Sequence, residues 1–398
     1  MLDRTLYFVV PGDLETRTGG YGYDRQIIAG LRERGWVVHL ISLAGTYPFP
    51  SVDARVDAAR AFAVIPDHAR VLLDGLAFGA LPVAALRERE RLRLVALVHH
   101  PLGLETGISA TEAGKLLASE REALTAAVGV VVTSQRTVST VEDLGVASNL
   151  IAVVEPGTEP AAPASGSRSL DSQIVPRVSQ VSIRQDDRPA ERGQRSSASS
   201  EAADHRSRRP EARLASPLHM VCVASLVPRK GHDTLFDALV QLAHLDWRLT
   251  CVGSFDRDAE YAAKLTARCN TPPLRDRVVL VGELAGAALD SAYDVADLFV
   301  LPTHYEGYGM VVAEALARAI PVVSTRTGAI AELVGDAAGV LVPPGDAGAL
   351  AQVIATLITD RDQLDRLRRG AESRRTSLPT WQSAAESMEK ALVRLTGE

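Results

Sequence analysis

Apolar and polar positions follow two spacings in the first part of the chain. Short runs rich in Val, Ile and Leu are typical of buried strands. They occupy residues 5–10, 36–43, 69–75, 94–100, 128–134 and 150–155. The intervening segments, such as 23–35 and 109–127, repeat apolar residues at the three- and four-residue spacing of helices. Apolar strands that alternate with helices predict a parallel sheet covered on both faces.

The same alternation starts again near residue 217. A second set of apolar runs predicts strands at 219–225, 247–254, 277–283, 297–303, 320–326 and 339–345. The sequence therefore predicts an α/β protein with two tandem Rossmann-like domains, each a doubly wound parallel sheet, at residues 1–158 and 217–375. Ligands bind beyond the carboxyl ends of the strands in such sheets, so two facing sheets would enclose a cleft.

The segments outside these two domains have a different composition. Residues 159–216 contain no aromatic residue and are dominated by Ser, Arg, Ala and acidic residues. We expect a disordered linker or insertion there, because it offers too little apolar surface to offset its ordering entropy. Residues 376–398 predict an amphipathic helix anchored by Trp381. It can pack back on the first domain or cap the second, and the sequence leaves both open.

Composition and charge exclude several classes of protein. The chain has 398 residues and a net charge of −6, so no basic surface indicates nucleic acid as a partner. Cys222, Cys251 and Cys269 show no metal-binding or disulfide spacing. No apolar stretch is long enough for a transmembrane segment. We expect free thiols in a cytoplasmic protein, while peripheral attachment at the inner membrane face stays open.

The stretch "HYEGYGMVVAEAL" contains two glutamates, Glu306 and Glu314, on either side of a glycine turn. In one continuous helix their side chains would not converge, since eight residues rotate by about 80°. Because a strand precedes the turn, we expect Glu306 in a loop and Glu314 early in a helix that begins near Gly309. Backbone N–H groups at that helix start would suit phosphate, and the two carboxylates would suit sugar hydroxyls. Ordinary acids at a helix start are the alternative.

At these residues the chain resembles the GT-B glycosyltransferases, specifically the retaining group called family 4. Its signature is a glutamate, an aromatic-glycine turn, a second glutamate and an A-x-A-x-x-x-P-V-V run. Residues 306–334 here read "EGYGMVVAEALARAIPVVSTRTGAIAELV". The resemblance covers both predicted domains and implies that the second binds a nucleotide sugar and the first an acceptor. It implies that Glu306 contacts the donor sugar and Glu314 the ribose. The donor would also meet the main chain of Gly307, Tyr308, Gly309 and Met310.

Other glycines and cations have a weaker signal of their own. Lys230 lies in a loop after a strand, where its ammonium can meet a diphosphate or simply be solvated. The Gly19-Gly20 pair lies between a predicted strand and helix and lacks the spacing of an NAD-binding loop. The resemblance implies diphosphate contacts for Lys230 and Gly20. It also places His99, the first of two adjacent histidines, at the active site near the transferred sugar, whereas the residues alone leave open a hydrogen-bonded structural histidine. Gly282 and Glu283 would lie near the base.

One departure from the family concerns phosphate binding. The family has Gly-Arg where this chain has Ala224-Ser225, and Arg229 beside Lys230 is the candidate replacement. We expect a metal-independent, retaining hexosyltransferase that needs no cofactor and uses a nucleoside diphosphate sugar and a hydroxyl acceptor. That acceptor is a saccharide, a lipid-linked molecule or a small molecule. The alternatives are an epimerase or phosphorylase of the same fold, and a non-catalytic nucleotide-sugar-binding protein.

Overall fold

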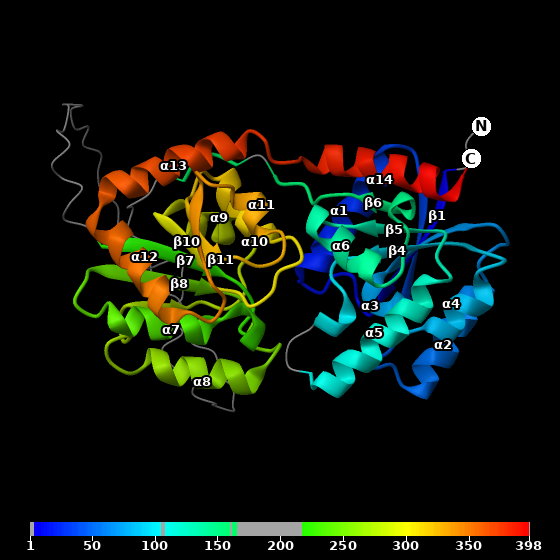
Figure 1. Cartoon of the computed structure of the whole chain (residues 1–398), viewed down its shortest axis with the longest axis horizontal. Coiled ribbons are helices and arrows are strands. Elements are labelled where there is room, and N and C mark those ends of the chain that lie inside the picture. Colours follow the sequence, from blue (N-terminus) through cyan, green and yellow to red (C-terminus); the bar gives the residue numbers. More distant parts are fainter. Residues whose placement is uncertain (1–3, 105–107, 160, 165–216, 398) are drawn as a thin grey trace, which may run out of the picture.

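The computed structural model describes residues 4–104, 108–159, 161–164 and 217–397. The predicted disordered segment, 159–216, therefore lies almost wholly outside the described residues. Two lobes are arranged side by side along the long axis of the molecule (Figure 1).

The first lobe is built on a six-stranded parallel sheet in the order β2-β1-β3-β4-β5-β6. Its strands are β1 Thr5–Pro11, β2 Val37–Leu43, β3 Arg70–Asp74, β4 Arg93–Val98, β5 Gly129–Val132 and β6 Ile151–Val153. Its helices are α1 Gly19–Glu33, α2 Val52–Ala63, α3 Gly75–Phe78, α4 Pro82–Glu88, α5 Ala110–Leu124 and α6 Gln135–Asp143, with 3-10 turns η1 Leu102–Leu104 and η2 Ser148–Leu150.

The second lobe repeats this design with a six-stranded parallel sheet in the order β12-β11-β10-β7-β8-β9. Its strands are β7 Leu218–Val223, β8 Trp247–Val252, β9 Val278–Leu280, β10 Leu298–Leu301, β11 Val322–Thr325 and β12 Gly339–Val342. Its helices are α7 His232–Gln241, α8 Ala259–Cys269, α9 Ala287–Asp294, α10 Met310–Ala317, α11 Ile330–Val334, α12 Ala347–Thr359 and α13 Arg361–Arg375, with a 3-10 turn η4 Pro228–Lys230. The predicted fold class, two doubly wound parallel-sheet domains, is confirmed.

Alternate residues of the first sheet pack on opposite faces. Leu6, Phe8 and Val10 of β1 belong to one apolar cluster, whereas Val9 belongs to the other. This period of two, with both faces apolar, is the reason the strands appear in the sequence as continuous apolar runs. The second domain has one large cluster around its sheet, in which Cys222 and Cys251 are buried free thiols.

The C-terminal helix α14, Trp381–Thr396, packs on the first domain after the chain crosses back from the second (Figure 1). Met388 and Leu392 are fully buried in the same cluster as Tyr23 and Leu31 of α1. A methyl group added at Gly30 would lie 2.5 Å from the Cβ of Ala385, so the glycine permits the close approach of the two helices. The last helix therefore completes the core of the first domain.

The described part of the chain has no helix with the length and apolarity to cross a membrane.

Candidate functional site

Both sheets have a switch point at which the strand order reverses. In the second sheet the chain builds β7, β8 and β9 outward in one direction and then places β10 on the other side of β7. In the first sheet β2 and β3 lie on opposite sides of β1. Doubly wound sheets bind ligands at the carboxyl ends of the strands beside such a point. Ligand-binding residues of the second domain are therefore expected in the loops that follow β7 and β10. Those of the first domain are expected in the loops that follow β1, β3 and β4.

Lys230 and Glu306 meet at the switch point of the second sheet. Lys230 follows β7, Glu306 follows the neighbouring strand β10, and the Lys230 Nζ lies 2.5 Å from Glu306 Oε2. Arg229 Nη1 lies 4.0 Å from the same oxygen and donates a hydrogen bond to the Tyr305 carbonyl at 3.0 Å. Burial acts to raise the pKa of Glu306, but Lys230 and Arg229 outweigh it and hold that pKa below its ordinary value. The structure thus places a partly buried carboxylate, 15% exposed, beside two cations.

The glycine turn after Glu306 leads directly into α10. Gly309 is the N-cap, with φ of 98°, a left-handed conformation that favours glycine. No side chain caps the helix, and the amides of Met310 and Val311 have no acceptor among the described residues. Such amides, with the positive end of the helix dipole behind them, suit a phosphate group.

Glu314 lies in the second turn of α10 and has its own set of partners. The Tyr293 hydroxyl of α9 donates a hydrogen bond to Glu314 Oε2 at 2.9 Å. Burial raises the pKa of Glu314, with Tyr293 and Arg318 acting in the opposite direction. Glu306 and Glu314 thus share no partner among the described contacts, and the idea that both border one pocket stays a prediction.

His99 lies at the switch point of the first sheet, directly after β4. Its Nε2 lies 3.2 Å from Oδ1 of Asp24 in α1 and 3.5 Å from Oδ2 of Asp74 at the end of β3. Asp24 is fully buried and Asp74 nearly so. Burial acts to lower the pKa of His99, but the two carboxylates raise it to about 10. Burial raises the pKa of Asp24 to about 6, against the effect of His99. The two neighbouring acids therefore favour the imidazolium form of His99.

The two domains touch close to these groups. The Ser134 hydroxyl donates to the Gly307 carbonyl at 3.1 Å, and a methyl group added at Gly307 would lie 2.4 Å from the His99 carbonyl. Met310 belongs to apolar surroundings in both domains, and its sulfur would lie 3.9 Å from a methyl group added at Gly19. Only a residue without a side chain fits at Gly307, so this glycine permits the contact between the domains.

Gly20 differs in its placement from the sequence prediction, and both it and His100 lie close to His99. Gly19 and Gly20 are the first two residues of α1 rather than a loop before it, since Thr18 caps the helix. A methyl group added at Gly20 would lie 3.4 Å from the His99 ring. His100 faces the second domain, with its ring centroid 5.9 Å from that of Tyr305. The adjacent histidines therefore point to different partners.

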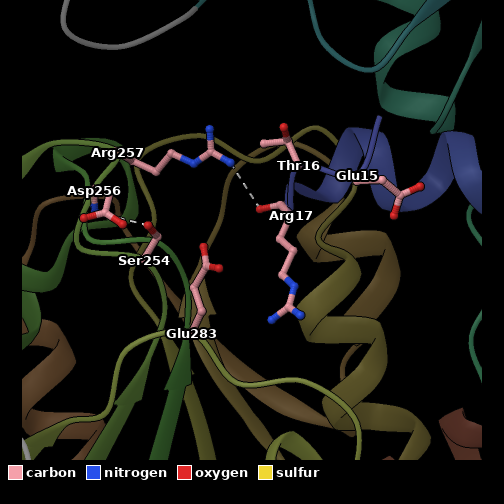
Figure 2. A pocket seen from close by; sticks show the side chains of 7 residues that line it. All are labelled: Glu15, Thr16, Arg17, Ser254, Asp256, Arg257 and Glu283. Atoms are coloured by element: carbon pink, nitrogen blue, oxygen red, sulfur yellow. Dashed lines mark hydrogen bonds between the residues drawn. The ribbon is translucent and has the colours of Figure 1, made fainter. Parts of the chain in front are cut away.

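A cavity of about 420 Å³ lies between the loops after β1 and those after β8 and β9. Arg257 reaches across it and donates to the Arg17 carbonyl at 3.5 Å, and Glu283 points into the space between them (Figure 2). Gly282, with φ of 75°, accepts from the Gly253 amide at 2.8 Å and turns the chain toward Glu283. The segment expected near the base therefore lines an opening between the domains.

Tyr308 packs into the core of the second domain and is only 7% exposed. A contact between its main chain and a ligand stays a prediction. Ser225 stands partly buried after β7, where the family has arginine. Arg229 lies beside Glu306, as the hypothesis of a replacement cation requires, although its role with a phosphate stays a prediction.

The sequence reasoning missed Asp24, Asp74 and Tyr293. Asp24 had a detectable signal, because it falls on the buried face of α1 with Ile27, Ile28 and Leu31, where an apolar residue is expected. Asp74 and Tyr293 had none, since their importance arises from contacts with residues distant in the chain.

Asp24, Asp74 and His99 are also the one group among the described residues with the ligand types and closeness to hold a metal ion, their ligand atoms all lying within 4.8 Å. Their mutual distances of 3.2 Å and 3.5 Å account for the cluster as a histidine held by two acids, without an ion.

Comparison with known proteins gives a consistent picture. Residues 205–374 match the family model "Glycosyl transferases group 1". The lipopolysaccharide core biosynthesis mannosyltransferase of Rhizobium meliloti is 30% identical over 149 residues, which are 36% of this chain and 42% of that protein. The D-inositol 3-phosphate glycosyltransferase of Xylanimonas cellulosilytica is 35% identical over 162 residues, which are 40% and 38% of the two chains. The matched region thus spans less than half the length of these relatives.

Solved structures resemble the whole chain. Sucrose-phosphate synthase from Thermosynechococcus elongatus superposes with a TM-score of 0.73 at 20% identity, covering 97% of this chain and 98% of the other. Anabaena HepE in complex with UDP-glucose gives a TM-score of 0.68 at 18% identity, covering 98% and 99%. At these identities the likeness establishes the fold. The protein therefore has the GT-B fold, and its C-terminal domain matches the glycosyl transferases group 1 family.

Proposed function

We propose that this protein is a retaining, metal-independent glycosyltransferase that moves a sugar from a nucleoside diphosphate sugar to an acceptor hydroxyl. The observation that carries the proposal is the partly buried Lys230–Glu306 pair beside the uncapped start of α10. A cation and free amides for phosphate, next to a carboxylate for sugar hydroxyls, match the parts of such a donor. The family match of the same domain supports this assignment.

The diphosphate would rest on the amides of Met310 and Val311 and draw Lys230 toward it. Lys230 would then leave Glu306, whose carboxylate becomes available to the hydroxyls of the donor sugar. Glu314, held by Tyr293, would accept from the ribose. In this arrangement one event, diphosphate binding, also prepares the sugar site.

In the reaction the bond between the anomeric carbon and the diphosphate oxygen breaks, and a bond to the acceptor oxygen forms on the same face. The departing diphosphate gathers negative charge, which Lys230 and the amides of α10 stabilise. It also takes the proton that the acceptor hydroxyl loses. His99 acts as a fixed positive charge, because an imidazolium held by Asp24 and Asp74 has no free site to accept that proton.

The test is incubation of the protein with a panel of nucleoside diphosphate sugars, with and without hydroxyl acceptors, followed by proton NMR of the products. We expect slow donor hydrolysis or transfer that keeps the anomeric configuration and is insensitive to EDTA. Inversion at the anomeric carbon would contradict the retaining mechanism. Binding without turnover would favour the non-catalytic alternative, and consumption of free phosphate would indicate a phosphorylase.

A further inference from the structure

A second cavity, of about 490 Å³, opens between the domains beside the Glu306 loop. Arg136 and Thr140 of α6 line it from the first domain. Tyr305, Arg326, Thr327 and Glu332 line it from the second. The proposed donor machinery uses none of these side chains.

The charges in this cavity are unevenly distributed. Arg136 and Arg326 are both exposed, and neither side chain has a hydrogen bond or ion pair with any of the described residues. Glu332 is the acidic lining residue, and its carboxylate forms no ion pair with either arginine within the described ranges. Among the described residues, the cavity therefore presents two guanidinium groups without an ion-pair partner and one carboxylate, together with the hydroxyls of Thr140 and Tyr305. The Thr327 hydroxyl donates to the His304 carbonyl at 3.2 Å.

The cavity lies directly next to the proposed transfer site. Tyr305 directly precedes Glu306 in the chain. Burial raises the pKa of Tyr305, and the positive charge of Arg136 acts in the opposite direction. The loop after β11 packs against the Glu306 backbone so closely that a methyl group at Gly328 would lie 1.5 Å from the Glu306 carbonyl. A molecule anchored between the arginines thus has its remainder within reach of the sugar held by Glu306.

We propose that this cavity binds a phosphate group of the acceptor, gripped between Arg136 and Arg326. The proposal rests on the glycosyltransferase function above and adds the substrate class. Arginine pairs with phosphate through two parallel hydrogen bonds, and two arginines on opposite walls can engage different oxygens of one group. A carboxylate has two oxygens, whereas two guanidinium groups and the hydroxyls of Thr140 and Tyr305 supply more donors than those oxygens can accept. The same phosphate can belong to a soluble sugar or polyol phosphate or to a lipid headgroup.

The first experiment is calorimetric titration with inorganic phosphate, with and without saturating UDP or GDP. A nucleotide displaces phosphate from Lys230 but leaves phosphate between the arginines. We expect phosphate binding that persists in the presence of nucleotide. Arg136→Ala and Arg326→Ala should each weaken it by about ten- to a hundredfold, as for loss of a charged hydrogen-bond partner.

Two further variants provide controls of opposite kinds. Glu332→Gln removes the negative charge of the cavity and should tighten phosphate binding. Arg89→Ala removes an arginine from the surface beside α4, where it pairs with Glu90, and should change nothing. Absence of nucleotide-resistant phosphate binding, or binding that survives both arginine substitutions, overturns the proposal. Failure of the wild-type protein to bind UDP or GDP is read separately and counts against the proposed function instead.

The source of the phosphate is distinguished by a second pair of measurements. Glycerol 1-phosphate is titrated in solution, and sedimentation is measured with phosphatidylcholine vesicles with or without phosphatidylglycerol. Arginine-dependent binding of glycerol 1-phosphate alone indicates a soluble acceptor. Arginine-dependent sedimentation with phosphatidylglycerol vesicles indicates a lipid headgroup. Binding to neither probe overturns the assignment to a phosphate-bearing acceptor.

Discussion

The substitution Asp24→Asn should return the pKa of His99 toward the ordinary value of a histidine. The two carboxylates lie 3.2 Å and 3.5 Å from His99 Nε2. At an effective dielectric constant of about 20, each attracts the imidazolium by about 5 kcal/mol. The rise in the pKa of His99 from 6.5 to about 10 corresponds to about 5 kcal/mol. This is less than the two attractions added together, because burial favours the neutral imidazole. At about 1.4 kcal/mol per pH unit, removing one charge should therefore lower the pKa of His99 by about 3–4 pH units.

The assay is an NMR titration of the histidine ring protons. The chain has 9 histidines, and the His99 signal is the one lost in His99→Gln. In the wild-type protein that signal should stay in its protonated position through neutral pH, and in Asp24→Asn it should titrate there. Asp67→Asn, at the opposite end of β3 from Asp74, should leave it unchanged.

The Asp24–His99 pair also affects how the free energy of unfolding depends on pH. Because the folded-state pKa of His99 is raised, its contribution is fully present below pH 6.5 and is lost as the pH rises toward 10. Asp24→Asn should flatten that part of the dependence of the free energy of unfolding on pH. A wild-type His99 that titrates near 6.5, or a variant whose His99 does not shift, would refute the reasoning.

Three other predictions concern the donor site and the core. Glu314→Ala should mainly weaken nucleotide binding, measured by calorimetry. Tyr293→Phe should weaken it less, by about 0.5–1.5 kcal/mol, because it loses one hydrogen bond to Glu314. Equal nucleotide affinity in the wild-type protein and both variants would remove Glu314 from the site. Met388→Ala should lower the free energy of unfolding of the first domain by about 2–5 kcal/mol in urea, because the side chain is fully buried, while the exposed Lys390→Ala should not. Burial raises the pKa of Glu120 to about 7, so the folded protein binds more protons than the unfolded chain between pH 4.5 and 7 and loses about 3 kcal/mol of stability across that window. Glu120→Gln, which can still accept from the Leu102 amide, should remove that loss in urea titrations at pH 5 and pH 8; an unchanged slope would contradict it.

The fold could be predicted because both sheets are buried on their two faces. Each strand then appears as a continuous apolar run, and the runs alternate with helices. The position of α14 could not be decided, because an apolar stripe fits either domain. Contacts between distant parts of the chain, such as Ala385 with Gly30 and Met388 with the apolar face of α1, place the helix on the first domain.

The candidate site could be predicted only in part. Glu306 and Gly309 follow a recognisable strand, so the loop position of Glu306 and the helix start near Gly309 could be predicted from the sequence. The pairing of Lys230 with Glu306 depends on β7 and β10 being neighbours, which strand order alone determines. The acids that surround His99 come from α1 and β3, and no local pattern connects them with β4. Contacts across the fold therefore carry the electrostatic part of the site.

The most direct test of the central claim is calorimetric titration of UDP and GDP into the wild-type protein and Lys230→Ala. The account predicts that one of the nucleotides binds the wild-type protein. It predicts that the variant binds it about ten- to a hundredfold more weakly, since a charged hydrogen bond to phosphate is worth roughly 1.5–3 kcal/mol. Equal affinity in a folded variant, or no binding of either nucleotide to the wild-type protein, would contradict it.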